Sequence, residues 1–500
     1  LARRAAGESV VLLKNDDALL PLAEGTRVAV IGDFAETPRY QGAGSSAVNS
    51  IKVDTFLDCL NDSGLHSVGF APGFERQGKP DAAKQAEAVA LAAEADAVLL
   101  CLGLDEIKES EGLDRADMKL ADNQIELLQA VREANPNTVV IVNAGASLET
   151  PWLAHCKALV YGALGGQAGA GAMVDVLTGK INPGGKLAET WANAYADTPA
   201  HDHFAGPGRT VQYREGLYVG YRYYQTAGVP VAFPFGHGLS YTQFAYSDLH
   251  ADAHSATLTV TNTGDRAGAE IVQLYVAKPN AEIFRPAQEL KAFAKVQLAA
   301  GESKTVTLTL DDKAFRYWNT RTDSWEMEGG TYELRVGASS ADIRLTAAVE
   351  VIGTDALNPY AGKALPHYQS GQVQTVPDAE WETLLGRPIP DDRVKIDRNM
   401  TLGELNHGRS PLGWLIWAVM TVLLNASYKK GKPDLNVLFQ YNMPLRALAK
   451  MTNGAISMGM VDGIVMEVQG FWVIGLVRVI FEAVKNVILN AQLENRLRNS

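Results

Sequence analysis

The sequence predicts a protein of several domains: an α/β sandwich on an open, mostly parallel sheet, then a β-sandwich, then a helical C-terminal tail. Its 500 residues exceed the usual size of one hydrophobic core. Short apolar runs alternate with helical patterns in the first half, whereas the period of apolar residues changes to two from about Tyr246. We therefore expect domains at 1–245 and 246–352, a linker at 353–400 and a helical, Met-rich tail at 401–500.

The first domain is predicted from buried strands that alternate with helices. Its strands are short aliphatic or β-branched runs followed by Gly or polar residues: Arg27–Ile31, Ala97–Gly103, Thr138–Asn143 and Ala158–Tyr161. Residues 81–95 and 122–134 have helical composition, and Asp81 and Asp122 are placed to cap them. A further helix is expected at 169–178, which Gly179 would end. This alternation is typical of an α/β layered domain.

The second domain shows the alternation of half-buried strands. Apolar and polar residues alternate within 256–261, 269–275, 303–310 and 331–336. Turn-forming clusters such as Asn262-Thr263-Gly264-Asp265 separate these runs. The pattern predicts a β-sandwich, and because the segment lacks cysteine, any immunoglobulin-like character must be of the fibronectin type.

The tail holds the sharpest apolar run of the chain, at 412–424. As a helix this run would be about 20 Å long, against ~30 Å for the hydrocarbon core of a bilayer. Further on, Arg478, Glu482 and Lys485 recur at helical spacing, which predicts one polar stripe on an otherwise buried helix. We therefore expect the tail to pack on protein and not to associate with a membrane.

Composition argues against several kinds of partner. The chain has 45 basic and 57 acidic residues and a net charge of −12, without a basic block that could neutralise phosphates, so no nucleic-acid partner is expected. Cys59, Cys101 and Cys156 form no CxxC or Cys/His pattern, so no metal site, cofactor or disulfide framework is predicted. A reducing compartment, the cytoplasm, fits best. The chain opens without Met or a secretory signal, so either no signal existed or the true N-terminus is absent.

The loop after the run Ala97–Gly103 is the segment richest in chemically active side chains. It reads Leu104-Asp105-Glu106-Ile107-Lys108-Glu109-Ser110-Glu111-Gly112-Leu113-Asp114-Arg115. Ligands bind at the carboxyl ends of strands in open parallel sheets, so this loop lies where a site is expected. Gly112 permits an unusual backbone angle beside Glu111, and Asp114-Arg115 could form an ion pair that fixes the loop. The alternative is a solvated acidic loop.

Three other segments invite a functional interpretation, but a structural alternative is favoured for each. The loop 41–46 matches neither the GxGxxG pattern of dinucleotide-binding sites nor the Walker pattern of phosphate-binding loops. A tight turn whose Ser residues cap a helix or line a cleft is therefore favoured. His201-Asp202-His203 has no further ligands nearby and is expected to be a surface loop. The Tyr-rich segment 213–224 and the run 233–238 could stack on sugar rings, although a domain seam is favoured.

Several short motifs occur along the chain in an informative order. They are Glu8-Ser9-Val10-Val11-Leu12-Leu13-Lys14-Asn15, Val28-Ala29-Val30-Ile31-Gly32, the loop 41–46, Glu111-Gly112-Leu113-Asp114-Arg115, Asn182-Pro183-Gly184-Gly185-Lys186-Leu187 and Phe233-Pro234-Phe235-Gly236-His237-Gly238-Leu239-Ser240-Tyr241. In the β-sandwich, Gln273-Leu274-Tyr275-Val276 and Gly337-Ala338-Ser339-Ser340 continue the series. Together these motifs resemble the second domain and the fibronectin type III-like domain of glycoside hydrolase family 3. The resemblance covers roughly Leu1 to Val351.

The resemblance implies a retaining β-glycosidase, usually a β-glucosidase, that hydrolyses terminal β-D-glucosyl residues of small glucosides or oligosaccharides. In the family the Glu of the EGxDR loop is the general acid/base, a role that carries over to Glu111. The leaving oxygen must receive a proton from a carboxyl group with a raised pKa, and a retaining pair of carboxyl groups lies ~5 Å apart. Glu109 is the alternative, but its position does not match the motif. No residue is assigned to substrate binding.

The main departure from the family is that its (β/α)₈ barrel has no counterpart in this sequence. In the family the nucleophilic Asp and most sugar-binding residues lie on that barrel. The chain therefore looks like the C-terminal portion of an enzyme, completed by a barrel in cis or in trans, and a homo-oligomer stays open. The alternative function is a non-catalytic sugar-binding or interaction module derived from such an enzyme.

Overall fold

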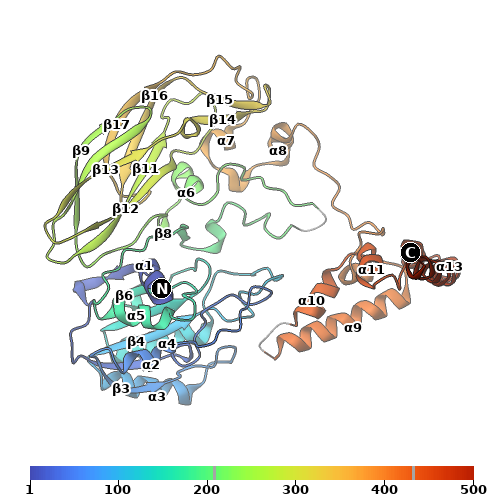
Figure 1. Cartoon of the computed structure of the whole chain (residues 1–500), viewed down its shortest axis with the longest axis horizontal. Helices are drawn as coiled ribbons and strands as arrows, with labels where there is room; N and C mark the ends of the chain where they lie inside the picture. The colour runs from blue at the N-terminus through green and yellow to red at the C-terminus, as the bar shows by residue number, and fades with distance from the viewer. Residues whose placement is uncertain (207–209, 431–433, 500) are drawn as a thin grey trace.

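The computed structural model describes residues 1–206, 210–430 and 434–499, which form an α/β domain, a β-sandwich and a helical tail (Figure 1). The strands of the α/β domain are β1 Val11–Asn15, β2 Arg27–Ile31, β3 His66–Ala71, β4 Ala97–Gly103, β5 Thr138–Asn143 and β6 Ala158–Tyr161. They form one sheet in the order β1-β6-β5-β4-β2-β3, in which β1 is antiparallel to β6 and all other neighbours are parallel. The predicted class is confirmed, and the four predicted strands are β2, β4, β5 and β6.

The helices of this domain begin and end largely where the sequence signals stand. They are α1 Ala2–Ser9, α2 Phe56–Leu60, α3 Ala82–Ala93, α4 Asp122–Ala134 and α5 Gly169–Leu177. The Asp81 carboxylate caps α3 by accepting from the N–H groups of Ala83 and Lys84 at 3.0 and 3.2 Å. Asp122 is instead the first helical residue of α4 and caps nothing. Gly179 follows α5 with a φ of +72°, as expected of a glycine that ends a helix.

The β-sandwich consists of two antiparallel sheets, β13-β10-β9 and β12-β11-β16-β17. Their strands are β9 Phe244–Ala251, β10 Ser255–Asn262, β11 Gly268–Ala277, β12 Glu289–Leu298, β13 Ser303–Thr309, β16 Gly330–Gly337 and β17 Ile343–Val351. Alternate residues of the strands, such as Leu258, Leu274 and Leu334, meet in one buried core. A hairpin of β14 Arg316–Asn319 and β15 Ser324–Met327 stands beside the two sheets.

The Tyr-rich segment and the connection after β17 pack against each other. The elements of this region are β7 Trp191–Ala192, β8 Val231–Phe233, α6 Tyr221–Ala227, α7 Pro366–Ser370 and α8 Asp378–Leu385. Tyr218, Tyr223 and Tyr368 are buried in one cluster, and the Tyr218 hydroxyl donates to the Tyr368 carbonyl oxygen. The favoured seam interpretation is confirmed for these buried tyrosines, whereas Tyr213 at the start of the segment is 70% exposed. The first part of the segment expected as a linker is folded onto this seam because its own apolar residues, such as Leu365, complete the cluster.

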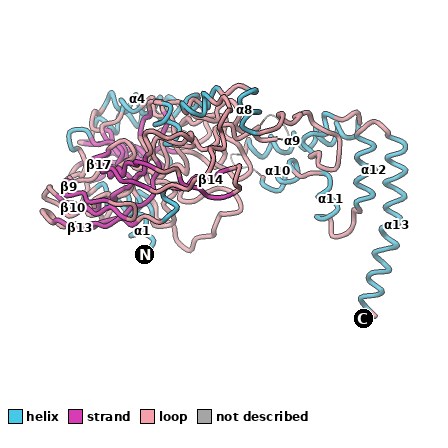
Figure 2. Tube along the Cα trace, turned by 90° about the horizontal axis from the view of Figure 1, so that it is seen from above, coloured by secondary structure: helices cyan, strands magenta, loops and turns pink. Residues whose placement is uncertain are grey.

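The tail consists of α9 Pro411–Tyr428, α10 Leu435–Asn442, α11 Leu445–Met451, α12 Met458–Val468 and α13 Trp472–Arg498. Six residues form its small buried core: Met400, Leu405, Leu445, Val461, Val465 and Val468. α12 and α13 lie side by side, and Gly463 and Gly475 allow their close approach, since a Cβ on Gly475 would lie 2.7 Å from the Gly463 oxygen. Figure 2 shows the tail to one side of the two domains, with α13 extending to the C-terminus.

The expectation that the apolar run 412–424 packs on protein is wrong for most of its length. α9 buries only Gly413, Leu424 and Ser427, whereas Val422, for example, is 66% exposed. The tail core is too small to cover more than one face of this helix. By length and composition alone, α9 is the one helix among the described residues that could cross a membrane.

Candidate active site

The acidic loop follows β4 at the carboxyl end of the sheet, where the sequence predicts a site. Its backbone is fixed from within, since the Asp105 carboxylate accepts from the N–H groups of Ile107 and Lys108 at 2.9 and 2.7 Å. The Lys108 ammonium pairs with the Asp117 carboxylate at 2.8 Å. These contacts hold the loop in one conformation rather than as a free solvated segment.

The expected ion pair between Asp114 and Arg115 is not among the ion pairs of the described residues. The Arg115 guanidinium turns inward and donates to the Ser147 carbonyl oxygen at 3.4 Å. Burial lowers the pKa of this guanidinium. Neighbouring residues on a loop seldom point the same way, so the adjacency of two opposite charges in the sequence did not predict their contact.

The loop 41–46 lies against the acidic loop, and together they line a cavity of about 400 Å³. The Glu111 N–H donates to the Ala43 carbonyl oxygen at 3.0 Å. Gly44 has a φ of +127°, and a Cβ there would lie 2.5 Å from the Glu111 Cβ, so only glycine permits this approach. The lining residues are Arg39, Gly42, Ala43, Ser45, Ser46, Glu109, Glu111, Gly145 and Leu164. The interpretation that Ser residues of the loop line a cleft is confirmed.

Glu111 is exposed at the wall of this cavity. Its Oε2 atom accepts a hydrogen bond from the Ser45 N–H at 2.6 Å. The Ser45 hydroxyl and this N–H hold the pKa of Glu111 below its ordinary value, because both stabilise the ionised form. A general acid needs a raised pKa, so the lowered pKa departs from what the sequence interpretation requires.

Glu109 occupies a different environment, two residues earlier in the same loop. Its carboxylate pairs with the Arg39 guanidinium at 3.1 Å, and the side chains of Arg39 and Glu109 are 1% and 12% exposed. Both carboxylate oxygens lie 2.9 Å from the Gly145 N–H, which donates to them. Arg39 also donates to the carbonyl oxygens of Leu104, Asp105 and Glu109. Glu109 therefore fixes the loop to its neighbours.

Arg39 and Gly145 were not singled out by the sequence interpretation. Arg39 lies in the connection after β2, and Gly145 comes directly after β5. β2 and β5 are the two neighbours of β4 in the sheet, and the carboxyl ends of parallel strands meet at one edge. Knowledge of the strand order would have predicted both residues, because residues that follow β2 and β5 lie beside the loop that follows β4.

The tail touches the acidic loop through α10. Gly112 has a φ of +78°, and a Cβ on this residue would lie 3.0 Å from Cδ2 of Leu438, which is buried. The contact places a tail helix at the side of the residue next to Glu111. Figure 1 shows the α9–α10 end of the tail beside the loops of the α/β domain.

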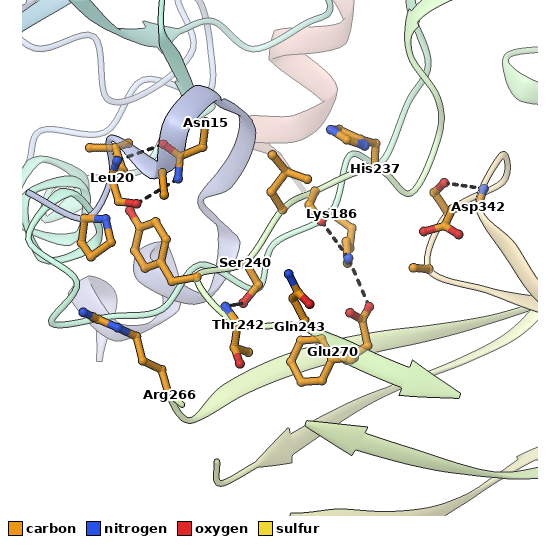
Figure 3. A pocket seen from close by; sticks show the side chains of 18 of the residues that line it. Asn15, Leu20, Lys186, His237, Ser240, Thr242, Gln243, Arg266, Glu270 and Asp342 are labelled. Atoms are coloured by element: carbon orange, nitrogen blue, oxygen red, sulfur yellow. Dashed lines mark hydrogen bonds and ion pairs between the residues drawn. The ribbon is translucent and has the colours of Figure 1, made fainter. Parts of the chain in front are cut away.

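A second cavity, of about 950 Å³, lies elsewhere, between the α/β domain and the β-sandwich (Figure 3). Two of the motifs meet there: the Lys186 ammonium donates to the Gly238 carbonyl oxygen at 2.9 Å and pairs with Glu270 of β11 at 3.1 Å. Asn182 likewise joins the motifs, since its Oδ1 accepts from the Ser240 hydroxyl at 2.8 Å. Of these contacts, the Lys186–Glu270 ion pair joins the two domains. Glu111 is not among the residues that line this cavity.

His201-Asp202-His203 lies in a turn, with Nδ1 of His201 2.8 Å from the Asp202 carboxylate. Within 1–206, 210–430 and 434–499, no three or more His, Cys, Asp or Glu side chains gather in a way that could hold a metal ion.

Comparison with known families finds two domains in the chain. Residues 10–241 match the glycosyl hydrolase family 3 C-terminal domain, and residues 270–340 match a fibronectin type III-like domain. Both matches fall on the α/β domain and the β-sandwich described above.

Named relatives and solved structures agree with these matches. An exo-α-(1→6)-L-arabinopyranosidase of Bifidobacterium breve is 44% identical over 375 residues, which cover 72% of this chain and 49% of the relative. Thermostable β-glucosidase B of Acetivibrio thermocellus is 43% identical, with 71% and 48% covered. The crystal structure of a family 3 β-glucosidase of Bifidobacterium adolescentis superposes with a TM-score of 0.69 at 43% identity, covering 75% of this chain and 56% of that one. The chain spans about half the length of the curated relatives it matches.

Proposed function

Because the chain carries the glycosyl hydrolase family 3 C-terminal domain followed by a fibronectin type III-like domain, we propose that it is the acid/base-bearing part of a retaining β-glycosidase. The proposed substrates are terminal β-D-glucosyl residues of small glucosides or oligosaccharides, in keeping with relatives named β-glucosidases. The arabinopyranosidase among the relatives leaves the choice of sugar open within glycosides. The nucleophile is proposed to lie on a (β/α)₈ barrel, supplied in cis or in trans.

The observation that carries the proposal is the contrast between two carboxylates of one loop. Glu111 is exposed at the cavity, whereas Glu109 is held by Arg39 and Gly145. A group that exchanges protons with a sugar must reach it and must change protonation without breaking the fold. Both carboxylates line the cavity, but Glu111 is exposed and forms no ion pair among the described residues, whereas Glu109 is 12% exposed and pairs with Arg39, so Glu111 suits the role better.

In the proposed reaction Glu111 protonates the glycosidic oxygen in the first step and takes a proton from water in the second. The second step suits the ionised carboxylate that Ser45 stabilises. For the first step, we infer that the barrel and the sugar close over the cavity and exclude water from Glu111. Such burial raises the pKa of a carboxyl group because it disfavours the charged form.

The proposal is tested with this chain joined to, or mixed with, the barrel of a family member. Glu111→Ala should slow glucosides with poor leaving groups by about 10²–10⁴-fold, the usual worth of general acid help. Dinitrophenyl glucosides should be slowed far less in the first step, and azide should partly restore their turnover by replacing the activated water. Full activity of Glu111→Ala on poor leaving groups, with loss in Glu109→Ala, would reject the assignment.

A second candidate is a non-catalytic sugar-binding or interaction module, which the lowered pKa of Glu111 favours. The same samples separate the two candidates. Glucose binding by the barrel-completed protein, measured by calorimetry, without any hydrolysis would support the module.

We also propose a cytoplasmic location, supported by three free cysteines, of which Cys101 and Cys156 are buried. Fractionation of the source cells would test this, and recovery only from the culture medium would reject it.

A further inference from the structure

We propose that the helical tail binds an anionic lipid bilayer, with α9 and α13 lying in the plane of its surface. The proposal does not depend on the glycosidase role, since it rests on the surface of the tail alone. Three observations carry it: two exposed apolar stripes, the residues at the ends of α9, and the distribution of charge.

The first observation is that α9 and α13 each expose an apolar stripe at helical spacing. The α9 stripe comprises Leu412, Leu415, Ile416, Val419, Val422 and Leu423, which are 39–66% exposed. The α13 stripe comprises Val473, Val477, Ile480, Phe481, Val484, Val487 and Ile488, which are 52–75% exposed. Their spacing of three and four residues puts each set on one helix face. Two such faces form far more exposed apolar surface than isolated residues of a soluble surface do, and such patches mark interaction sites.

The stripes face away from the tail's own core. The opposite side of α9 carries the buried Gly413, Leu424 and Ser427. In α13 the buried Gly475 packs on α12, and Arg478 pairs with Asp462 of α12 at 2.8 Å. Each helix therefore has one face fixed to the tail and one free, which is the arrangement of a helix that lies on a membrane surface rather than across it.

The second observation is the kind of residue at the two ends of α9. Trp414 is 55% exposed near the first turn, and Tyr428 is followed by the exposed Lys429 and Lys430 at the other end. No charged residue lies between Pro411 and Tyr428. Trp and Tyr favour the headgroup region of a bilayer, and Lys reaches its phosphates.

The third observation is a separation of charge between the tail and the rest of the chain. Residues 401–500 contain ten basic and six acidic residues, whereas the whole chain has 45 basic and 57 acidic residues. The tail is therefore positive on a protein whose net charge is −12. A positive surface beside apolar stripes is attracted to anionic lipid, while the acidic domains are repelled from it.

The pairing of these charges strengthens the asymmetry. Every acidic side chain of the tail has a partner within the protein: Glu404 with the Thr401 N–H, Asp434 with the N–H groups that it caps, Asp462 with Arg398 and Arg478, Glu467 with Ser410, Glu482 with Lys485 and Glu494 with Arg498. Six exposed basic residues have no ion-pair partner among the described residues: Arg409, Lys429, Lys430, Arg446, Lys450 and Arg496. These six are available to lipid phosphates.

The test is flotation of the full chain with vesicles of phosphatidylcholine alone or with 30% phosphatidylglycerol, an amount chosen as roughly that of an anionic leaflet. We expect the partition coefficient to be at least about tenfold higher with the anionic lipid at low salt and to fall at high salt, where charges are screened. A chain that stays unbound to both vesicles would overturn the proposal.

Paired substitutions locate the contact. Val419→Ser with Leu423→Ser in α9, and Val477→Ser with Val484→Ser in α13, should each lower the partition coefficient about tenfold, because apolar area no longer enters the bilayer. All four side chains are exposed, so the fold should be kept, as circular dichroism checks. The matched control, Ile352→Ser with Leu357→Ser, removes two exposed apolar side chains outside the tail and should change nothing. An equal loss of vesicle binding in the control pair would show that the tail is not the surface that contacts the bilayer.

Further outcomes separate lipid from other arrangements. Lys429→Gln with Lys430→Gln should reduce the preference for anionic vesicles and leave binding to neutral ones unchanged. If light scattering instead finds a dimer that the Ser pairs dissociate, and the wild type does not float, the stripes bind a second copy and the proposal fails. Retention in vesicles after extraction at high pH would overturn the in-plane arrangement, since only a spanning helix resists it.

Discussion

Glu109 and Glu111 are chemically identical and two positions apart, yet their surroundings assign them different tasks. Arg39, 1% exposed, can hold its charge inside the protein only because Glu109 and three carbonyl oxygens accept from it. Among the described residues, the Glu111 carboxylate has Ser45 as its hydrogen-bond partner, and the side chain is otherwise exposed. One carboxylate therefore stabilises the loop, and the other is free to react.

We expect the matched pair Glu109→Gln and Glu111→Gln to differ in stability. Glu109→Gln removes the counter-charge of a buried guanidinium and should lower the free energy of unfolding by about 3 kcal/mol. Glu111→Gln alters an exposed side chain and should leave the free energy of unfolding almost unchanged. Urea unfolding followed by tryptophan fluorescence measures both, and equal effects would contradict the division of tasks.

The pKa of Glu111 should depend on Ser45. Ser45 lowers this pKa, so the stabilisation that the carboxylate gives the fold is present above the ordinary Glu pKa and is lost as pH falls through the lowered one. Ser45→Ala removes the hydroxyl and keeps the N–H, so the pKa should rise but stay below the ordinary value. ¹³C NMR titration of the Glu111 carboxyl carbon reports it. Ser46→Ala, on the same cavity wall, is the control, and a shift of equal size there would contradict the assignment.

At the scale of elements, the β-sandwich has its own core and the tail barely has one. The alternating residues of seven strands bury Leu258, Leu274 and Leu334 between two sheets. The core of the tail is one cluster of six buried apolar residues, and one face each of α9 and α13 stays exposed. An element is stable alone only where its apolar face finds a partner within the same unit.

We accordingly expect residues 243–352 to fold when produced alone. The segment contains both sheets, and its core needs no disulfide, because no cysteine lies within it. Circular dichroism should show a β-type spectrum, and urea should unfold the segment in one cooperative transition. Leu274→Ala should destabilise it by about 2–5 kcal/mol, the cost of a cavity in a packed core. A disordered spectrum for the wild-type segment would show that its fold depends on the α/β domain.

In the whole molecule, the α/β domain that holds the acid/base candidate contacts both the β-sandwich and the helical tail. The Lys186–Glu270 ion pair fixes the sandwich to the α/β domain, and Leu438 brings a tail helix to the residue next to Glu111. α10 of the tail therefore contacts the loop that holds Glu111.

We expect this chain alone not to hydrolyse aryl β-glucosides. Hydrolysis with retention needs a nucleophile ~5 Å from the acid. Among the described residues, the one other carboxylate that lines the cavity is that of Glu109, and Arg39 holds it. Release of nitrophenol should therefore match the buffer blank until a barrel is added. Turnover by the isolated chain would show that both catalytic groups lie within these residues.

Much of the fold was predictable because its signals are local. Buried aliphatic runs such as Ala97–Gly103 are strands wherever they occur in an α/β domain, and Asp81 caps a helix through its own neighbours. β3 was missed because it lies at an edge of the sheet, is partly exposed and lacks a continuous apolar run. β1 was also missed, although its residues Val11, Leu12 and Leu13 are buried. The motif that contains Glu111 was also visible in the sequence.

Local patterns of residues were enough to predict most strands and helices of the α/β domain and the loop that holds the candidate acid. The partners of these residues depend on how the strands are ordered in space. Arg39 meets Glu109 across 70 positions because β2 and β4 are neighbours in the sheet, and no local pattern encodes that contact. The spacing of apolar residues likewise predicts that α9 and α13 have apolar faces. Whether such a face is buried depends on the size of the core beside it. The core of the tail is too small to cover the faces of both helices.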